Sequence, residues 1–398
     1  MARFYFFSDA FYPDWTGGLQ RYATELAVEA ASQGHHGALW TREWRPSGLH
    51  DVAAEVGEKF TVFEVFSWMP RRFRGVALLA AGFLGMNRMK ANAEIAVFHT
   101  AIVGGAFMRR KSKTRQVYVF HASAGHELLV EAAAQGKVGL RAKLKAALLF
   151  HLERKCVRAA DVVIVLSEFS RSLLETLHPR HAPKHVVVVP GGTRVPELGS
   201  TPQRIGSSRS ARRIVVLRRL EWRMGIDILL RAFASSVARQ QGWVLDVIGT
   251  GSQESALRSL AQELELGEDV VFHGRVSEEK RLQLLDDASL SVLPTRALEG
   301  FGLATVEAMA RGIVPIVTTA GASPELVRDI SQRLVCEPTV ESMRDAIDHW
   351  AADSSEELLR QLGETCRAQA QQYDWKTVFT AYEAILQDSP KAVLKSHT

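Results

Sequence analysis

Short apolar runs alternate with longer amphipathic stretches along most of the chain, in two successive series. In the first series, a strand-like run at 4–8 precedes apolar residues at helical spacing over 19–31, which predicts a strand followed by a helix. The remaining strands predicted in this series are 38–40, 61–66, 95–98, 116–120, 162–166 and 186–190. Because several of these runs are apolar without alternation, they predict a parallel sheet covered on both faces.

A second series of the same kind follows a polar, Gly- and Ser-rich stretch at 198–210, which we interpret as a linker. Its predicted strands are 213–217, 243–248, 270–272, 290–293 and 314–317, with helical stretches such as 226–239 and 253–264 between them. The pattern therefore predicts an α/β protein with two Rossmann-like domains, residues 1–200 and 201–373. An amphipathic helix opens the remaining segment, 374–398.

Two carboxylates bracket a glycine loop in the second series. Residues 299–307 read Glu-Gly-Phe-Gly-Leu-Ala-Thr-Val-Glu, follow a predicted buried strand and open a predicted helix that ends at Gly312. The amides of Phe301, Gly302 and Leu303 would then lie at a helix N-terminus, where unpaired donors bind phosphate. Glu299 and Glu307 could each accept hydrogen bonds from a hydroxylated ligand. The spacing predicts a site for a phosphorylated sugar compound.

The longer stretch 299–327 resembles the retaining, GT-B-fold glycosyltransferases usually called family 4. The resemblance implies two Rossmann-like domains facing a central cleft, with a C-terminal helix that crosses back to the first domain. It implies transfer of a sugar from a nucleotide-sugar donor to an acceptor hydroxyl with retention of anomeric configuration. By the same resemblance Glu299 contacts the donor sugar, Glu307 the ribose, and the amides of 301–303 the diphosphate.

Two places in the first domain also match the family. The pair Gly17 and Gly18 lies between the first strand and its helix, where the family brings donor phosphates and acceptor close to the chain. His121 follows the strand 116–120, at the sheet edge where open α/β sheets bind ligands. The family places a histidine there beside the donor sugar. The alternatives are an ordinary loop and a structural histidine.

One departure from the family concerns the cations that face the diphosphate. The family commonly has an arginine and, five residues later, a lysine before a glycine; Arg219 fits the first position, but Met224 occupies the second. Since neutralising the leaving diphosphate is much of the task of such a site, either Arg223 or Arg219 with the helix terminus must supply the charge. A lysine introduced at 224 is expected to keep or raise activity.

The nucleotide base is expected at two further positions. Gly249, in the sequence Gly-Thr-Gly after the strand 243–248, and Val276, after the strand 270–272, resemble the base pocket of the family in order and spacing. No pair of aspartates with metal-binding spacing is evident, so we expect neither a metal nor another cofactor. The nucleotide sugar is the only small molecule that the reaction would require.

Charge and cysteine content limit the kinds of partner and site that we expect. Residues 1–200 hold 26 Lys and Arg against 17 Asp and Glu, with clusters at 71–74, 109–115 and 137–158. Such clusters attract anionic lipids or anionic acceptors, although a charge run can also be a solvated face. No nucleic-acid-binding motif accompanies them. The three cysteines form no CxxC pattern, so neither disulfides nor a zinc site is expected.

The expected location is cytoplasmic, with peripheral contact at the inner face of the membrane. The N-terminus lacks signal-peptide features, and the longest apolar run, 76–86, is about half the length of a spanning helix. Aromatic and basic residues of 65–90 resemble an interfacial segment. The alternative is a helix that covers the first sheet.

Three functions remain open from the sequence. The first is a glycosyltransferase that acts on a glycan, a glycolipid or a small metabolite. The second is a sugar epimerase of the same fold, and the third is a nucleotide-sugar-binding protein whose catalysis was lost or altered when Met224 replaced the lysine. Measuring slow donor hydrolysis without acceptor separates the last two from the first.

Overall fold

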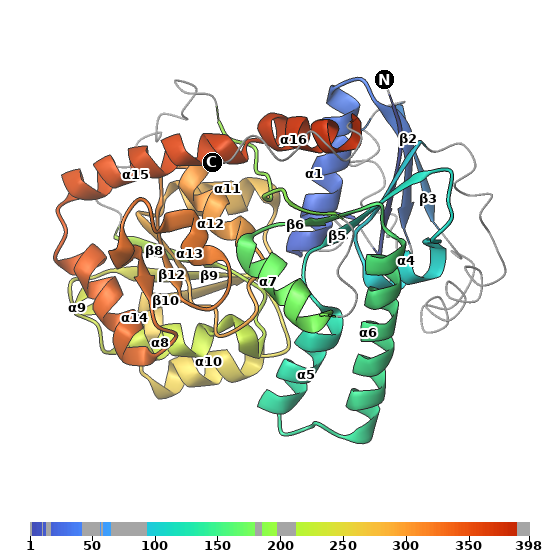
Figure 1. Cartoon of the computed structure of the whole chain (residues 1–398). Coiled ribbons are helices and arrows are strands. Elements are labelled where there is room, and N and C mark those ends of the chain that lie inside the picture. Colours follow the sequence, from blue (N-terminus) through green and yellow to red (C-terminus); the bar gives the residue numbers. More distant parts are fainter. Residues whose placement is uncertain are drawn as a thin grey trace. The chain divides into compact units, whose positions relative to one another are not determined.

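The computed structural model describes residues 2–9, 11–12, 17–41, 56, 59–64, 94–179, 185–196 and 212–387. The chain divides into two compact units (Figure 1). Unit 1 comprises Met1–Gly192 and Trp375–Thr398, and unit 2 comprises Thr193–Asp374. Thr193 lies with unit 2 because its N–H donates to the Tyr373 carbonyl at 2.8 Å.

Unit 1 is built on a seven-stranded parallel sheet in the order β3-β2-β1-β4-β5-β6-β7. Its strands are β1 (Arg3–Ser8), β2 (His36–Thr41), β3 (Phe60–Glu64), β4 (Ile95–Phe98), β5 (Arg115–Phe120), β6 (Val162–Val165) and β7 (Val186–Val188). All of them fall on runs that the apolar pattern predicted as strands. The sheet order reverses between β1 and β4, as in Rossmann-like domains.

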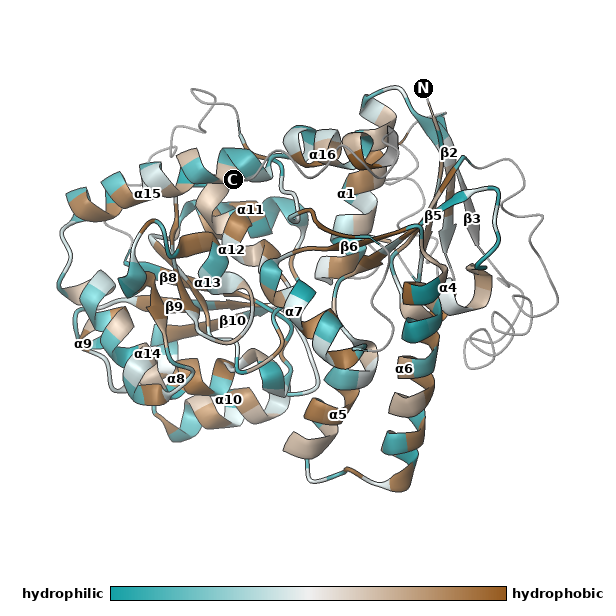
Figure 2. Cartoon of the chain, in the orientation of Figure 1, coloured by the Kyte–Doolittle hydropathy of each residue, from teal (hydrophilic) through white to brown (hydrophobic). Residues whose placement is uncertain are grey.

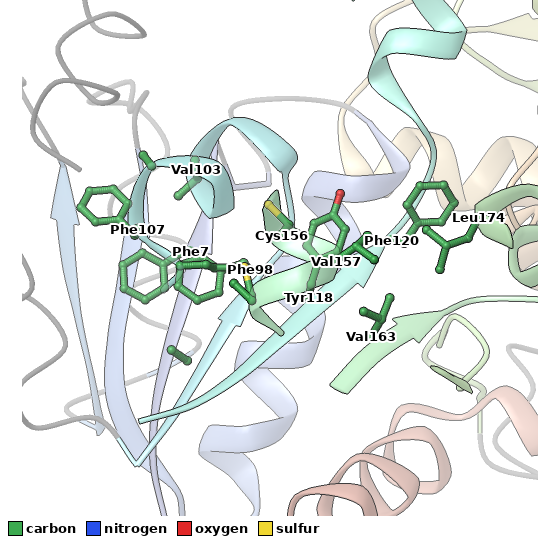
Figure 3. Close-up of a cluster of buried hydrophobic side chains, with 14 of the residues drawn as sticks. Phe7, Phe98, Val103, Phe107, Tyr118, Phe120, Cys156, Val157, Val163 and Leu174 are labelled. Atoms are coloured by element: carbon green, nitrogen blue, oxygen red, sulfur yellow. The ribbon is translucent and has the colours of Figure 1, made fainter. Parts of the chain in front are cut away.

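Helices cover both faces of this sheet, and a dense aromatic core lies beneath them. The helices are α1 (Gly18–Ser32), α4 (Ala101–Phe107), α5 (Ala124–Ala134), α6 (Leu140–Ala159) and α7 (Glu168–Leu177). In the core, the Phe7 and Phe98 rings stack with centroids 4.6 Å apart, and the Cys156 thiol is fully buried beside them (Figure 3). Continuous burial of the strands explains why their sequences do not alternate.

The C-terminal helix α16 (Trp375–Gln387) packs on unit 1, as the resemblance implied (Figure 1). The Tyr382 hydroxyl hydrogen bonds the Tyr22 hydroxyl of α1, and the Phe379 ring lies 6.2 Å from that of Phe4. At the far end of the helix, Arg115 Nη2 donates to the Ile385 carbonyl at 2.6 Å. The end of the chain therefore completes the core of the first unit.

Unit 2 holds a six-stranded parallel sheet in the order β10-β9-β8-β11-β12-β13. The strands are β8 (Arg213–Leu217), β9 (Val244–Ile248), β10 (Val270–Gly274), β11 (Leu290–Leu293), β12 (Val314–Thr318) and β13 (Val335–Cys336). The helices are α8 (Ile226–Ala234), α9 (Val237–Gln240), α10 (Glu254–Glu263), α11 (Glu278–Asp286), α12 (Leu303–Ala310), α13 (Ser323–Val327), α14 (Val340–Ile347) and α15 (Glu356–Ala370). In Figure 2, apolar strands such as β8 and β9 lie beneath helices with hydrophilic outer faces.

Two predicted segments lie outside the described residues: the linker 198–210 and the interfacial segment 65–90. Among the helices that the structure describes, none combines the length and the apolar composition needed to cross a bilayer.

Candidate functional site

The charged side chains of the candidate site lie where the strand order of the unit 2 sheet reverses, which is its switch point. Strands β8 and β11 are neighbours there, although β9 and β10 lie between them in the sequence. Arg218 directly follows β8, and Thr295 and Glu299 follow β11. Since ligands of open α/β sheets bind beyond the carboxyl ends of the strands at such a point, these residues occupy the place where a ligand is expected.

Arg218 connects the two loops at this point. Its Nη1 donates to Glu299 Oε2 at 2.5 Å, and its Nη2 donates to Thr295 Oγ1 at 2.8 Å. The same Nη2 lies 2.8 Å from the Met224 sulfur. The side chains of Arg218 and Glu299 are only 8% and 16% exposed. The pair is therefore largely shielded from water, where an ion pair is strong and its geometry well defined.

The surroundings of Glu299 keep its carboxyl group ionised. Burial by itself raises the pKa, but the charge and hydrogen bond of Arg218 oppose this, and the Arg223 charge and the Phe301 amide add to the opposition. The net result is a pKa below the ordinary value. Glu299 is thus an acceptor-only group at neutral pH, suited to binding hydroxyl groups. The Phe301 amide, predicted to face a phosphate, is engaged by this carboxylate.

The two arginines that the sequence predicted as diphosphate ligands lie in different environments. Arg219 has an exposed side chain, and Arg223 is buried and donates to the Leu298 carbonyl at 3.0 Å. Leu298 adopts φ +61°, a region that non-glycine residues seldom occupy and that often accompanies functional sites. Arg223 therefore holds the strained backbone next to Glu299, and the cation beside Met224 is Arg218.

The glycine loop opens a helix, as its sequence predicted. Gly302 is the residue before α12 and has φ +96°, which favours glycine. A Cβ atom there would come within 2.8 Å of Ser323 Oγ and 3.2 Å of Thr305 Oγ1. Both hydroxyls are buried and have no hydrogen-bond partner within the described part of the chain. Two such groups beside the first turn of α12, which begins at Leu303, are suited to a polar ligand.

Glu307 lies one turn further along α12 and is paired. Arg281 of α11 donates from Nη1 to Glu307 Oε2 at 2.7 Å and also bonds Glu278, at 2.8 Å from Nε. Glu307 is only 8% exposed. Arg281 thereby fixes the direction of the carboxylate that was predicted to bind ribose, a role that sequence spacing did not indicate.

Gly249 and Val276 serve the packing of the loops behind the site. Gly249 has φ +138°, and a Cβ atom there would lie 1.9 Å from the Arg218 carbonyl. Its amide donates to the Gly274 carbonyl at 3.0 Å, and Val276 packs against the core around Val215. A glycine at 249 thus lets the loop after β9 pass close to the backbone of Arg218.

In unit 1, His121 forms part of a pair of histidines. His121 follows β5, His99 follows the neighbouring strand β4, and His99 Nδ1 lies 3.2 Å from His121 Nε2. Burial lowers the pKa of His121 to about 3, and burial together with His121 places the pKa of His99 well below its ordinary value. Both rings are therefore neutral at physiological pH. The position of His99 at a strand end was the signal that could have revealed it.

Aromatic rings from distant parts of the chain surround His121. Tyr22 of α1 meets its ring edge-on, with centroids 4.8 Å apart and an interplanar angle of 83°. Trp375 of α16 also packs edge-on with Tyr22, at 5.2 Å between centroids. The C-terminal helix therefore supports the histidine through Tyr22.

The glycine pair lies at the start of α1. Gly17 is the residue before the helix, Gly18 is its first residue, and the Gln20 side chain lies against Gly17. The first turn carries no acidic residue, which leaves the positive end of the helix dipole uncompensated there.

Within the described ranges, no group of three or more His, Cys, Asp or Glu side chains is arranged to hold a metal ion. Metal independence remains a prediction.

Two family models match successive parts of the chain. The model described as "Glycosyltransferase Family 4" matches residues 16–195, and that described as "Glycosyl transferases group 1" matches residues 201–369. Together they cover most of both units. The chain belongs to the group 1 glycosyltransferases with the GT-B fold.

Individual relatives are more distant. The chain is 31% identical over 231 residues to an exopolysaccharide phosphotransferase of Streptomyces coelicolor, an alignment that covers 56% of this chain and 23% of the relative. It is 26% identical over 251 residues to a GDP-mannose-dependent monoacylated alpha-(1-6)-phosphatidylinositol monomannoside mannosyltransferase of Corynebacterium glutamicum, covering 60% of this chain and 65% of that one. The matched parts thus span less than two thirds of either relative.

A solved structure shares the fold over nearly the whole length. Anabaena HepE in complex with UDP and glucose superposes with a TM-score of 0.72 and 16% identity, covering 98% of this chain and all of that one. At that identity the likeness shows the fold alone.

Proposed function

We propose that the protein transfers a sugar from a nucleotide-sugar donor to an acceptor hydroxyl, with retention of anomeric configuration, in the synthesis of a cell-envelope polysaccharide or glycolipid. The observation that carries the proposal is the shielded Arg218–Glu299 pair at the switch point of unit 2. The names of the relatives support the donor and acceptor classes, since they include a GDP-mannose-dependent enzyme acting on a lipid and a complex with UDP and glucose.

In this proposal, the residues at the switch point bind the sugar diphosphate. Glu299 accepts hydrogen bonds from the donor sugar, and Arg218 balances the charge that develops on the diphosphate as it leaves. The amides of Gly302 and Leu303 and the unpartnered hydroxyls beside them complete the phosphate site. Arg218 thereby does what the family lysine, replaced here by Met224, would otherwise do.

The remaining residues have supporting roles. Glu307, held by Arg281, accepts hydrogen bonds from the ribose, and Gly249 and Val276 border the base. His121 contacts the donor sugar as a neutral ring, because burial prevents its protonation. The Gly17–Gly18 pair borders the donor phosphates and the acceptor.

The chemical step breaks the bond between the anomeric carbon and the phosphate oxygen. The acceptor hydroxyl oxygen attacks from the face of the leaving group, and its proton passes to the departing phosphate. The configuration is therefore retained. Double displacement through Glu299 is the alternative, but its carboxylate is already bonded to Arg218 and the Phe301 amide, which lowers its nucleophilicity. The reaction as proposed requires neither a metal nor a further cofactor, and its location is the cytoplasmic face of the membrane.

The test begins with thermal shifts against UDP, GDP and ADP sugars, each compared with its nucleotide. The donor that stabilises the protein most beyond its nucleotide is then supplied with soluble and lipid-linked acceptors, and the anomeric configuration of the product is read by NMR. We expect transfer with retention, lost in Arg218→Ala and kept in Arg328→Ala, which removes an exposed arginine of the same unit. An inverted product would contradict the mechanism.

Two other outcomes correspond to the alternative functions. Transfer only to a soluble metabolite would identify small-molecule glycosylation. Donor binding without transfer or hydrolysis would identify a binding protein, a function that rested on the missing lysine at 224. Arg218 beside Met224 supports a transferase over this binding protein.

A further inference from the structure

A row of exposed leucines marks one face of α6 in unit 1. Leu140, Leu144 and Leu148 are 73%, 63% and 50% exposed. Their spacing of four residues places them along the same side of the helix. The other large apolar side chains that are exposed in the described residues lie just before α6, at Val138, or singly on unit 2. A contiguous exposed apolar row of this kind commonly marks a binding surface.

The surroundings of this row are basic. Residues 132–152 contain no Asp or Glu and four cations, Lys137, Arg141, Lys143 and Lys145, all of them exposed. Apolar side chains flanked by cations are characteristic of helices that lie in the interface of anionic membranes. Figures 1 and 2 show α5 and α6 running side by side away from the unit 1 sheet, with apolar residues on α6.

A basic cavity continues the same face toward the C-terminal end of α6. The cavity has a volume of about 500 Å³ and is lined by Arg109, Arg110, His151, Arg154, Lys155 and Arg158, with Met108 and Ala159. Positions 151, 155 and 158 lie on the helix face of 140, 144 and 148, because they follow at spacings of three and four. The face is thus apolar in its first half and cationic in its second.

Backbone carbonyls hold two of the cations that line the cavity, Arg109 and Lys155. Arg109 Nη1 donates to the carbonyls of Ala106 and Met108 at 2.8 and 3.0 Å, and Lys155 Nζ donates to the Gly105 carbonyl. In the part of the chain that the structure describes, none of the five Arg and Lys residues pairs with a carboxylate, and no carboxylate lines the cavity. The charge that a bound anion would neutralise is therefore already assembled.

We propose that this face of α6 docks on a membrane surface rich in anionic lipids. The leucine row enters the boundary between headgroups and acyl chains, and the basic cavity receives a lipid phosphate. Docking would deliver the protein to a lipid-linked acceptor, so its purpose rests on the proposed function, whereas the surface itself rests on α6. This surface contains residues of two basic clusters that the sequence indicated for anionic lipids, 109–115 and 137–158, and none of the segment 65–90.

The experiment is flotation of the full chain with phosphatidylcholine vesicles, with and without phosphatidylglycerol. We expect binding only to the anionic vesicles. Arg154→Glu/Arg158→Glu should lower the partition coefficient on the order of thirtyfold or more, since each basic residue at an anionic surface contributes about fivefold. Leu144→Ser/Leu148→Ser should lower it by tenfold or more, whereas the matched control Leu358→Ser/Arg328→Glu on unit 2 should not change it.

A second measurement reports insertion directly. In Leu144→Trp, the emission of the added tryptophan should shift to shorter wavelength with anionic vesicles and not with neutral ones. Absence of binding by the wild type, binding equal in all variants, or capture of α6 by a protein partner with no vesicle binding would each overturn the proposal. Transfer to a soluble acceptor without vesicle binding would overturn the surface and leave the function standing. Vesicle binding without any transfer would overturn the proposed function and leave the docking surface standing.

Discussion

The histidine site of unit 1 and the arginine site of unit 2 hold their functional side chains by different means. In unit 2, Arg218 and Glu299 are fixed by charge, in loops that follow adjacent strands. In unit 1, His121 is neutral and packs against the ring of Tyr22, which in turn packs against Trp375. We therefore expect damage to the arginine site of unit 2 to appear mainly as lost turnover, and damage to the histidine site of unit 1 mainly as lost stability.

The largest effect should come from Trp375→Ala in unit 1. Trp375 is only 3% exposed, and its ring lies against both Tyr22 and Gly192, so removal leaves a cavity between α16 and α1. We expect the free energy of unfolding to fall by about 3–5 kcal/mol, measured by denaturant titration. Trp375→Phe should lose much less. Equal losses in the two variants would contradict the packing role.

Removing the Arg218 guanidinium from the unit 2 site should lower turnover instead. We expect Arg218→Ala to lower kcat about a hundredfold or more, as loss of a donor to a developing negative charge does. Met224→Lys in the same protein should restore part of the activity, since it returns a cation to this place. Met224→Lys alone should lower activity, because the ammonium would meet the Arg218 guanidinium; the sequence had indicated the opposite.

Both single and double variants are compared with Arg328→Ala, using folded protein and saturating donor. No recovery in the double variant would show that the two side chains do not share a role.

The two glutamates of unit 2 should differ in kinetics. Glu307→Ala should raise KM with little change in kcat, because ribose binding is the same in ground and transition states, whereas Glu299→Ala should lower kcat as well. Losing hydrogen bonds to a charged group costs about 1.5–3 kcal/mol, so KM should rise about ten- to a hundredfold. Arg281→Met should produce a smaller rise of the same kind. Unchanged kinetics in folded Glu307→Ala would remove the ribose assignment.

The smallest expected effect is the pH dependence of stability that His121 of unit 1 causes. Because the pKa of His121 is lowered to about 3, the unfolded chain binds a proton below about 6.5 that the folded protein refuses. Above that pH, His121 should therefore not lower the free energy of unfolding. As pH drops below it, the free energy of unfolding should fall by about 1.4 kcal/mol per pH unit for one histidine. His121→Asn should flatten the dependence between pH 6.5 and 5. The lowered pKa of Glu299 acts in a separate window, below the ordinary carboxyl range.

Much of the fold was predictable because its signals are local. Each strand of unit 1 is a short apolar run, and glycines lie at or next to an end of α1, α5 and α6. Burial and helix ends can therefore be predicted from neighbouring residues. The glycine loop before α12 was predictable for the same reason, since φ +96° at Gly302 favours glycine. The paired residues Arg281 and His99 were not predicted, because their partners lie on other elements.

The arginine beside Met224 shows where sequence reasoning ends. The sequence determined that this chain has two parallel-sheet domains, a glycine loop between two glutamates, and arginines at 218 and 219. The chain stays extended past β8, where the amides of Arg218 and Leu220 bond the carbonyls of Ile248 and Thr250, so adjacent side chains point to opposite sides. Which of the two arginines faces Glu299 was decided only when β8 and β11, distant in sequence, became neighbours in the sheet.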